Sequence, residues 1–333
     1  MPKRATIGDV AAAASVSVAT VSRVLNGGVV KNATAQRVWQ EVDRLEYAPN
    51  ALTRSIFAGR SSTIGVVIRD LGSPFYLDLM KGIDEVAALN GSLVMFANTF
   101  RRDDREAAQV ATMDEQRVRG LILTTGQAAD AKSRRMAENG TPCVTVTRAV
   151  QNPPPGLHSV TLDNVGAGRL MAAHLTACGR SSVGVIASGA RPSQLERTAG
   201  LREGLEAAGA ALPAEMIEAV NSEHDVKDSV STLLARARAM GSPLDAIVCH
   251  TGRFAVDVFA ALATQDLAVP DDIAFLTMDD FPWAAPLGIT VVSQPSYEMG
   301  RSAAELIVEK PEESTQITFE PTLIARTSCG EAT

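Results

Sequence analysis

The sequence of 333 residues lacks any run of about 18 apolar residues, which a membrane-spanning helix would need. Its start, MPKRATIGDVAAAASV, has two basic side chains but no continuous apolar segment before Asp9, so it is unlike a secretory signal. The four cysteines are far apart and form no C-x-x-C pair. These absences argue against a membrane protein, a disulfide framework and a zinc site, and they predict a cytoplasmic protein with reduced thiols.

Signatures of catalysis are also absent. The sequence shows no paired carboxylates, nucleophile elbow, metal-spaced cluster or phosphate loop. The segment GAGRLM at residues 166–171 resembles a dinucleotide loop but lacks its third glycine, so we interpret it as a helix start. His174 lies in a helical pattern and is assigned to packing. The sequence therefore predicts no enzyme, no metal and no cofactor.

Charge is unevenly distributed along the chain. Residues 1–61 hold eight Lys and Arg against four Asp and Glu, a net charge of +4, whereas the whole chain carries −7. A small basic head on a large acidic body indicates that only the head meets a polyanion. Chance remains the alternative interpretation of so small an excess.

Helical spacing dominates the first 45 residues. Thr6, with Asp9 three positions later, predicts a capping box for a first helix. Ser17 is a good cap for a second helix, and Thr34 for a third. The predicted inner faces consist of Ile7, Val10, Ala11, Ala14, Val21, Val24, Leu25, Val38, Val42 and Leu45. The strand-like alternation of VSV at residues 16–18 is outweighed by this spacing.

Two short helices joined by a tight turn at residues 15–16 predict a helix-turn-helix unit. If the second helix buries its apolar face, the side chains that point outward are those of Val18, Ala19, Ser22 and Arg23. Small apolar groups can touch thymine methyls, and arginine can bond guanine through two hydrogen bonds. Hydroxyl groups that can bond phosphates are those of Ser17, Thr20 and Ser22. A plain three-helix bundle without a DNA-binding face fits the same helices.

The segments TIGDVAAAASVSVATVSRVLNG, YAPN and ALTRSIFAGRSSTIGVVI resemble the N-terminal region of the LacI/GalR family of bacterial transcription regulators. The resemblance covers about 60 continuous residues and extends more diffusely over the chain. It departs at Ser15, where the family usually has glycine. The resemblance implies that Val18 and Ala19 set operator preference and that Arg23 reads a base. The full set of implied DNA contacts is Thr6, Ser17, Val18, Ala19, Thr20, Ser22, Arg23, Asn26, Asn50, Thr53 and Ile56.

The resemblance also implies a hinge helix at about residues 50–58, in which Ile56 wedges into the minor groove of the operator. The family more often has leucine there, and packing of Ile56 on the body is the alternative. So short a helix is marginal in water and needs a second copy and the DNA groove to cover its apolar side. We therefore expect a homodimer, or a higher oligomer, on a pseudo-palindromic double-stranded operator.

In the body, β-branched apolar runs alternate with helical patterns, which predicts parallel sheets covered on both faces. These runs lie at residues 63–68, 92–98, 120–125, 143–147, 182–188, 245–250, 273–278 and 289–295. Their number predicts two α/β lobes, with ligands beyond the carboxyl ends of the strands.

The segments VTLDNVGAGRLMAAHLTACGRSSVGVI and IAFLTMDDFPWA resemble the family's regulatory domain, which shares the type I periplasmic-binding-protein fold. The implied fold class is a small all-α helix-turn-helix domain with a hinge helix, residues 1–61, followed by a two-lobed α/β effector and dimerisation domain, residues 62–333. The chain is expected to cross between the lobes three times. The expected N-lobe is about 62–161 plus 292–321, and the expected C-lobe about 162–291 plus 322–333.

The resemblance implies a cleft that binds a small-molecule effector, a carbohydrate or a related polyol or nucleoside. Its implied residues are Phe75, Tyr76, Arg191, Arg197, Thr251, Asp279 and Trp283. An arginine fork and a carboxylate can bracket a polyol's hydroxyls, with aromatic side chains against its apolar faces. Alternatives remain open: Arg197 as a surface charge, Asp279 as a helix cap, and the aromatic pair as lobe core. Asp163 and Asn164 fit an N-cap pair better than ligands.

One departure concerns the effector. Where many sugar-responsive members have an Asn-Asp or Asn-Asn pair, this chain has Thr251 and Gly252 in HTGRFA, which weakens the case for an ordinary hexose. His250 is either a replacement contact or a structural histidine. Together these features predict an effector-controlled, dimeric DNA-binding repressor that is nucleoid-associated when bound. A solute-binding protein without a gene-regulatory role is the second hypothesis.

Overall fold

The computed structural model describes residues 5–25, 28–47, 61–124, 126–189 and 191–331. The chain divides into two compact units, residues 1–61 and 62–333. Each unit is described by itself below.

The first unit is a bundle of α1 (Ile7–Ala13), α2 (Val18–Leu25) and α3 (Asn32–Arg44). Thr6 and Asp9 form the predicted capping box. Ser17 caps α2, since its Oγ accepts from the Thr20 N–H at 3.2 Å. The predicted cap at Thr34 is wrong: α3 begins two residues earlier, after Lys31, and Thr34 lies inside its first turn. Of the described helices, none alone is long and apolar enough to cross a membrane; α1 and α2 together reach that composition, with a 105° bend between them.

The predicted inner faces of these helices meet in one core. Its fully buried members are Val10, Ala11, Ala14, Val21, Val24, Val38, Val42 and Tyr47. Ile7, Leu25 and Leu45 pack against this core at its edge. Burial of this apolar face holds three short helices together that would be marginal in isolation.

Ser15 adopts a φ of 53° in the turn between α1 and α2. A left-handed backbone costs a residue with a Cβ about 1–2 kcal/mol, a cost that glycine avoids. Since glycine also loses more chain entropy on folding, we expect Ser15→Gly to stabilise the first unit by roughly 0.5–1 kcal/mol. Thermal unfolding followed by Trp39 fluorescence in a Trp283→Phe background would measure it. Ser15→Ala, which keeps the Cβ, is the control, and an equal effect of both changes would contradict the prediction.

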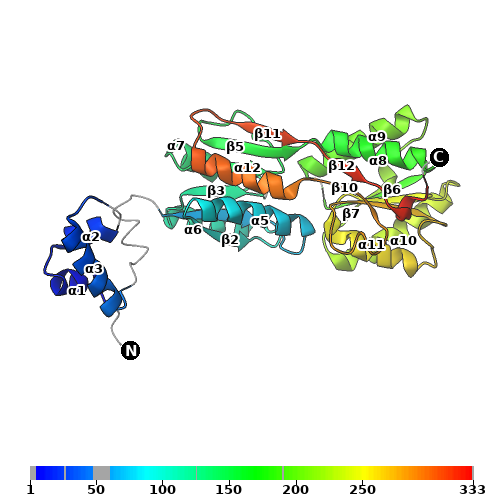
Figure 1. Ribbon diagram of the computed structural model, residues 1–333. Coiled ribbons are helices and arrows are strands. Elements are labelled where there is room, and N and C mark those ends of the chain that lie inside the picture. Colours follow the sequence, from blue (N-terminus) through cyan, green and yellow to red (C-terminus); the bar gives the residue numbers. More distant parts are fainter. Residues whose placement is uncertain (1–4, 26–27, 48–60, 125, 190, 332–333) are drawn as a thin grey trace. The chain divides into compact units, whose positions relative to one another are not determined.

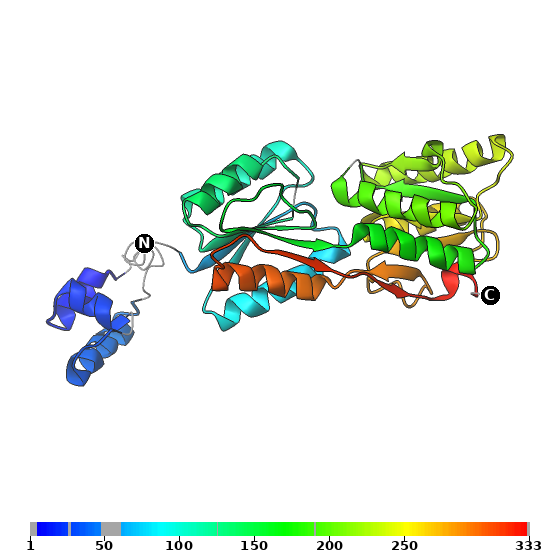
Figure 2. The same cartoon turned by 90° about the horizontal axis from the view of Figure 1, so that it is seen from above.

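The second unit contains two lobes, each a six-stranded sheet between helices (Figures 1 and 2). In the first lobe the strand order is β11-β5-β4-β3-β1-β2. Its strands are β1 (Thr63–Ile68), β2 (Leu93–Asn98), β3 (Gly120–Leu123), β4 (Cys143–Val146), β5 (Leu157–Leu162) and β11 (Gln316–Phe319). Its helices are α5 (Pro74–Leu89), α6 (Asp103–Glu115), α7 (Asp130–Glu138) and α12 (Ser296–Glu309). Successive residues of β1 enter separate cores on the two faces, which explains its continuous apolar run.

The second lobe repeats this plan with the order β12-β10-β9-β8-β6-β7. Its strands are β6 (Val183–Ala187), β7 (Ile217–Ala219), β8 (Ala246–Cys249), β9 (Ala274–Met278), β10 (Thr290–Ser293) and β12 (Thr322–Ile324). Its α-helices are α8 (Asn164–Ala177), α9 (Pro192–Ala207), α10 (Glu223–Ala239) and α11 (Ala255–Ala263). Short 3-10 helices are η1 (Ala214–Met216), η2 (Gly252–Phe254) and η3 (Thr327–Cys329).

The chain passes between the lobes after β5, after β10 and after β11. All paired strands of the two sheets run parallel except β12, which pairs antiparallel with β10. The prediction of parallel strands is therefore wrong for β12 alone. Because β12 continues the direction of β11 across the boundary, it runs against the other strands of the second sheet.

Glycines set the packing of one helix pair in each lobe. A Cβ on Gly168 of α8 would lie 2.1 Å from the Arg197 carbonyl oxygen, and one on Gly200 of α9 would lie 2.0 Å from the Val165 carbonyl oxygen. In the first lobe, Gly82 of α5 and Gly300 of α12 make the same reciprocal contact. The segment at residues 166–171 is thus the predicted helix start with small packing residues.

Candidate functional site

The axes of α1 and α2 meet at 105°, within the range of about 90–120° that helix-turn-helix units show. Val18 is 42% exposed, and Ala19 and Arg23 are also exposed. The aliphatic stem of Arg23 lies over Gly28, where an added Cβ would meet its Cγ at 2.5 Å. The outward face that the sequence predicts for α2 is therefore present, and the side chain of Arg23 on this face packs against the backbone of Gly28.

Some hydroxyl groups of the first unit already form hydrogen bonds within it. Thr6 donates its Oγ1–H to Asp9 at 2.7 Å, and the Ser17 and Thr20 hydroxyls bond each other at 2.9 Å. Ser22 is half-buried. The remaining predicted contacts, Asn26, Asn50, Thr53 and Ile56, lie outside the described residues, as does the predicted hinge helix at 50–58.

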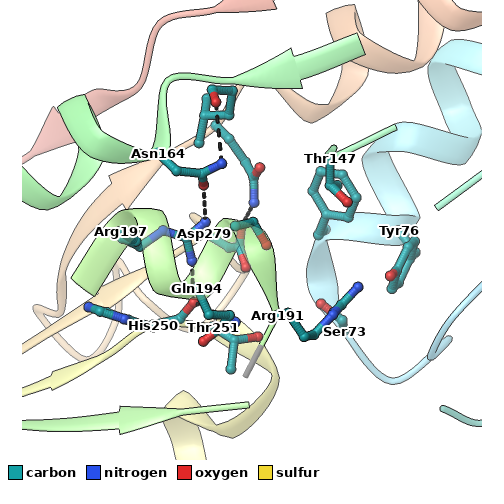
Figure 3. Close-up of a pocket in the computed structure, with 14 residues that line it drawn as sticks. Ser73, Tyr76, Thr147, Asn164, Arg191, Gln194, Arg197, His250, Thr251 and Asp279 are labelled. Carbon is teal, nitrogen blue, oxygen red and sulfur yellow. Dashed lines mark hydrogen bonds between the residues drawn. The ribbon is translucent and has the colours of Figure 1, made fainter. Parts of the chain in front are cut away.

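A polar cavity of about 60 Å³ lies between the two lobes (Figure 3). Six of the seven predicted cleft residues line it: Phe75, Tyr76, Arg191, Arg197, Thr251 and Asp279. The others that line it are Ser73, Thr147, Leu162, Asn164, Ser193, Gln194, His250 and Gln294. Many of them directly follow strands of both sheets, as the rule for carboxyl ends of parallel strands requires.

Arg197 projects from α9 and is only 5% exposed, so it is not a surface charge. Its guanidinium donates to Asn164 Oδ1 at 2.6 Å and to the His250 carbonyl oxygen. Burial lowers the pKa of Arg197 to about 10, although the nearby Asp279 carboxylate raises it. Arg197 therefore stays protonated near neutral pH, and its Nε, which has no partner among the described residues, keeps donor capacity.

Asp279 follows β9 with a φ of 68°, and it is 6% exposed. Its Oδ2 accepts from the Gly252 N–H at 3.0 Å, and its Oδ1 accepts from Gln294 Nε2 at 2.5 Å. The carboxylate thus caps η2, as one interpretation of the sequence holds, and also faces the cavity. Each carboxylate oxygen has a second acceptor site, which leaves capacity for a ligand hydroxyl.

Phe75 and Tyr76 fit both interpretations of the sequence, since they are part of the lobe core and also line the cavity. Both residues lie in the first turn of α5. Their rings meet edge to face at 5.2 Å. Burial raises the pKa of Tyr76, so its phenol is a neutral donor at neutral pH.

Trp283 does not line this cavity. It is 51% exposed and packs edge-on against Phe281, with ring centroids 6.1 Å apart. Because the segment after Asp279 turns outward and buries Phe281 instead, Trp283 faces a separate surface hollow of about 680 Å³ with Leu71 and Leu77. The prediction that Trp283 lines the cleft, which rested on its closeness to Asp279 in the sequence, is therefore wrong for this cavity.

Asn164 is a second residue of this region that the sequence assigned wrongly. Asp163 alone caps α8, by accepting from the Gly166 N–H at 2.8 Å. Asn164 is buried, bonds Arg197 and lines the cavity. Thr147 and Gln294 were missed, although both follow apolar strands as the assigned residues do. His250 is fully buried, and burial lowers the pKa of its imidazole well below the usual value, so the ring is neutral.

Contacts between residues outside the cavity lining fasten the two lobes to each other. Arg253 of η2 donates to Asp70, which follows β1, at 3.2 Å, and to Glu223 at 2.8 Å. Arg101 of the first lobe donates to the Asn221 carbonyl oxygen. Both guanidinium groups stack on the Phe254 ring, 5.4 and 5.6 Å from its centroid. In this structure the lobes are therefore joined by one ion pair, Arg253–Asp70, and one hydrogen bond to backbone as well as by chain.

The residues that the structure describes contain no group of three His, Cys, Asp or Glu side chains able to hold a metal ion. Their four cysteines are free thiols. The cavity's polar groups are hydrogen-bond donors and acceptors suited to an organic ligand.

A helix-turn-helix head and a two-lobed body with a polar cavity define the class of ligand-responsive DNA-binding regulators. Residues 6–50 match the model of bacterial regulatory proteins of the lacI family, and residues 61–327 match the model of periplasmic binding proteins and the sugar-binding domain of the LacI family. The chain belongs to the LacI family. It is therefore a DNA-binding transcriptional regulator, not an enzyme.

Individual relatives agree over nearly the whole chain. The transcriptional regulator GalS of Salmonella typhimurium is 31% identical, over 97% of this chain and 96% of its own. The transcriptional regulator DegA of Bacillus subtilis is 28% identical, over 98% of both. A CelR–cellobiose complex is similar with a TM-score of 0.71 at 26% identity, over 98% of this chain and all of that one. The lac repressor dimer bound to operator shares the fold, with a TM-score of 0.81 at 22% identity, over 99% and 100% of the two chains.

Proposed function

We propose that this regulator is a repressor whose affinity for its operator is controlled by a small polyol-like effector in the cavity between the lobes. The observation that carries the proposal is that the buried side chains of Arg197 and Asp279 line one polar cavity between two lobes. A ligand there contacts both lobes and changes their closure, so it can act only through its differential affinity for the open and closed forms. The similar CelR structure holds cellobiose, which supports a carbohydrate-like ligand.

The proposal includes a homodimer in the cytoplasm on a pseudo-palindromic operator. One supporting feature is the exposed apolar surface around the second hollow, where Leu71, Leu77 and Trp283 are 55%, 57% and 51% exposed. Apolar surface of this kind, rimmed by Asp78 and Lys81, is typical of protein–protein contacts. The lac repressor with the same fold is a dimer on its operator.

Fluorescence anisotropy with labelled genomic fragments tests the regulator against the alternative of a solute-binding protein. We expect a few fragments to bind far more tightly than the rest at physiological salt. A thermal-shift screen of sugars, polyols and nucleosides then supplies ligands to test for release or enhancement of binding. Equal affinity for all fragments would overturn the proposed repressor.

Arg23→Ala tests the assignment of the reading helix. If Arg23 bonds a guanine edge, its loss should remove roughly 1–3 kcal/mol of discrimination at one base pair in each half-site. Arg37→Ala is the matched control, because Arg37 is exposed on α3, away from the face of α2. Binding measured on a library of single-base operator variants checks both. An unchanged sequence preference of Arg23→Ala would refute the assignment.

A further inference from the structure

A second cavity of about 520 Å³ adjoins the first, since Thr147, Arg191 and Ser193 line both. Three arginines line this second cavity: Arg69, Arg148 and Arg191. Only Asp103 among its lining residues carries negative charge, and its side chain is exposed. The extended cavity thus presents more guanidinium groups than its lining carboxylates balance.

The arginines differ in how they are neutralised. Arg148 is 9% exposed and forms an ion pair with Asp130. Arg69 and Arg191 form no ion pair with any residue that the structure describes, and the buried Nε of Arg69 has no hydrogen-bond partner there. Arg69 and Arg191 are thus the two donors left for a ligand.

These two groups line the same cavity but come from different lobes. Arg69 follows β1 of the first lobe, and Arg191 precedes α9 of the second. Burial lowers the pKa of Arg69, and the positive charge of Arg191 is the next largest cause. Burial raises the pKa of Tyr76, and the charge of Arg191 opposes that rise. Burial lowers the pKa of Arg197, and Arg191 adds to that effect, so the charge of Arg191 reaches the middle of the cavity. Two like charges held together across a cleft repel each other unless an anion lies between them.

Helix ends add to this potential. The first turns of α5, α8 and α9 all contribute residues to the first cavity, namely Phe75, Asn164 and Ser193. The N-terminus of a helix carries a partial positive charge and presents free N–H groups. Carboxylates behind the lining are engaged: Glu106 accepts from the Gly126 and Ala129 N–H groups, and Glu196 accepts from Asn164.

We propose that the effector carries an acidic group, a carboxylate or a phosphate, which Arg69 and Arg191 bind jointly from the two lobes. Its hydroxyl groups then lie against Arg197 and Asp279. The acidic group bridges the lobes and removes the repulsion between the two arginines, so it favours closure. This inference rests on the proposed function, because it names the chemical class of the proposed effector.

The test uses the full chain and inorganic sulfate as the probe. The unfolding midpoint is measured against sulfate at constant ionic strength, with chloride as the reference, for the unaltered protein, Arg69→Gln, Arg191→Gln and the control Arg169→Gln. Arg169 is exposed on α8, paired with Glu203 and far from either lining. We expect a saturable rise of roughly 2–4 °C in the unaltered protein and the control, and its loss in the two other variants. General stabilisation by sulfate acts on all four alike.

Matched ligand pairs separate the two acids. D-gluconate against D-glucose tests a carboxylate, and D-glucose 6-phosphate against D-glucose tests a phosphate, with affinities measured by calorimetry. At least one acid should bind about tenfold or more tightly than glucose, and Arg69→Gln should remove the difference. Arg69→Lys keeps the positive charge and should retain part of the difference in affinity. This variant replaces Arg69→Gln in the experiment if Arg69→Gln fails to fold.

An equal sulfate response of all four proteins, or tighter binding of glucose than of both acids, would overturn the inference. The same preparations are tested for sequence-preferring DNA binding. DNA binding with four equal sulfate responses overturns this inference alone. A sulfate response that needs both arginines, without sequence preference on DNA, overturns the proposed repressor alone.

Discussion

Asp279→Asn is expected to weaken effector binding by about tenfold to a hundredfold while operator binding stays intact. A ligand hydroxyl that donates to a charged carboxylate gains about 1.5–3 kcal/mol, most of which a neutral amide cannot supply. Asparagine suits the site otherwise, because it tolerates the φ of 68° and can still accept from the Gly252 N–H. The measurement is the concentration of the first screening hit that half-maximally changes operator affinity.

The neighbouring carboxylate provides the control for this experiment. Asp280 also follows β9, but it forms an ion pair with Arg326 near the surface and does not line the cavity. Since Asp280 does not reach the cavity, Asp280→Asn should leave the effector response nearly unchanged. A normal response of Asp279→Asn would remove Asp279 from the effector site.

Gly168→Ala should destabilise the second unit by roughly 3 kcal/mol, although alanine is the better helix former by about 1 kcal/mol. The added methyl group would lie 2.1 Å from the Arg197 carbonyl oxygen, which is backbone and cannot rotate away. Since α8 and α9 carry Asn164 and Arg197, their separation should also weaken effector binding. Chemical denaturation of the full chain in a Trp39→Phe background, followed by Trp283 fluorescence, measures the loss of stability.

Ala173→Leu supplies the comparison on the same helix. Ala173 is exposed on α8, so the larger side chain meets no backbone and should change stability by less than about 0.5 kcal/mol. If Gly168→Ala stabilised the protein instead, helix propensity would outweigh the contact, and close packing of α8 on α9 would not be required.

The sequence predicted those parts of the fold that have strong apolar periodicity. The eight apolar runs of the body all contain strands. Seven of these strands are almost wholly buried, as continuous apolar runs predict, whereas β2 exposes Leu93 and Phe96. Four strands were missed: β5, β7, β11 and β12. β5 includes the buried polar residues His158 and Ser159, and His158 Nδ1 accepts from the Thr315 N–H at 3.1 Å. A hydrogen bond between segments 157 residues apart leaves no trace in local periodicity.

In the cavity, too, some residues could be predicted from the sequence and others could not. Arg197 and Asp279 could be placed by the motifs around them, and the structure brings both into one cavity. Arg69 could not be predicted, since nothing beside it in the sequence relates it to Arg191. Only the meeting of the two lobes places these arginines on opposite sides of the same space.

The three passages of the chain between the lobes limit how an effector can act. Two lobes joined by one connecting segment could rotate about several axes. Three connecting segments restrict the lobes to little more than one motion, a hinge bending about the line through the three segments. Reciprocal glycine contacts also bring one pair of helix backbones close together within each lobe. We therefore expect a ligand bound in the cavity to act through one rotation of the lobes, which reaches the chain leading to the DNA-binding unit at the start of β1.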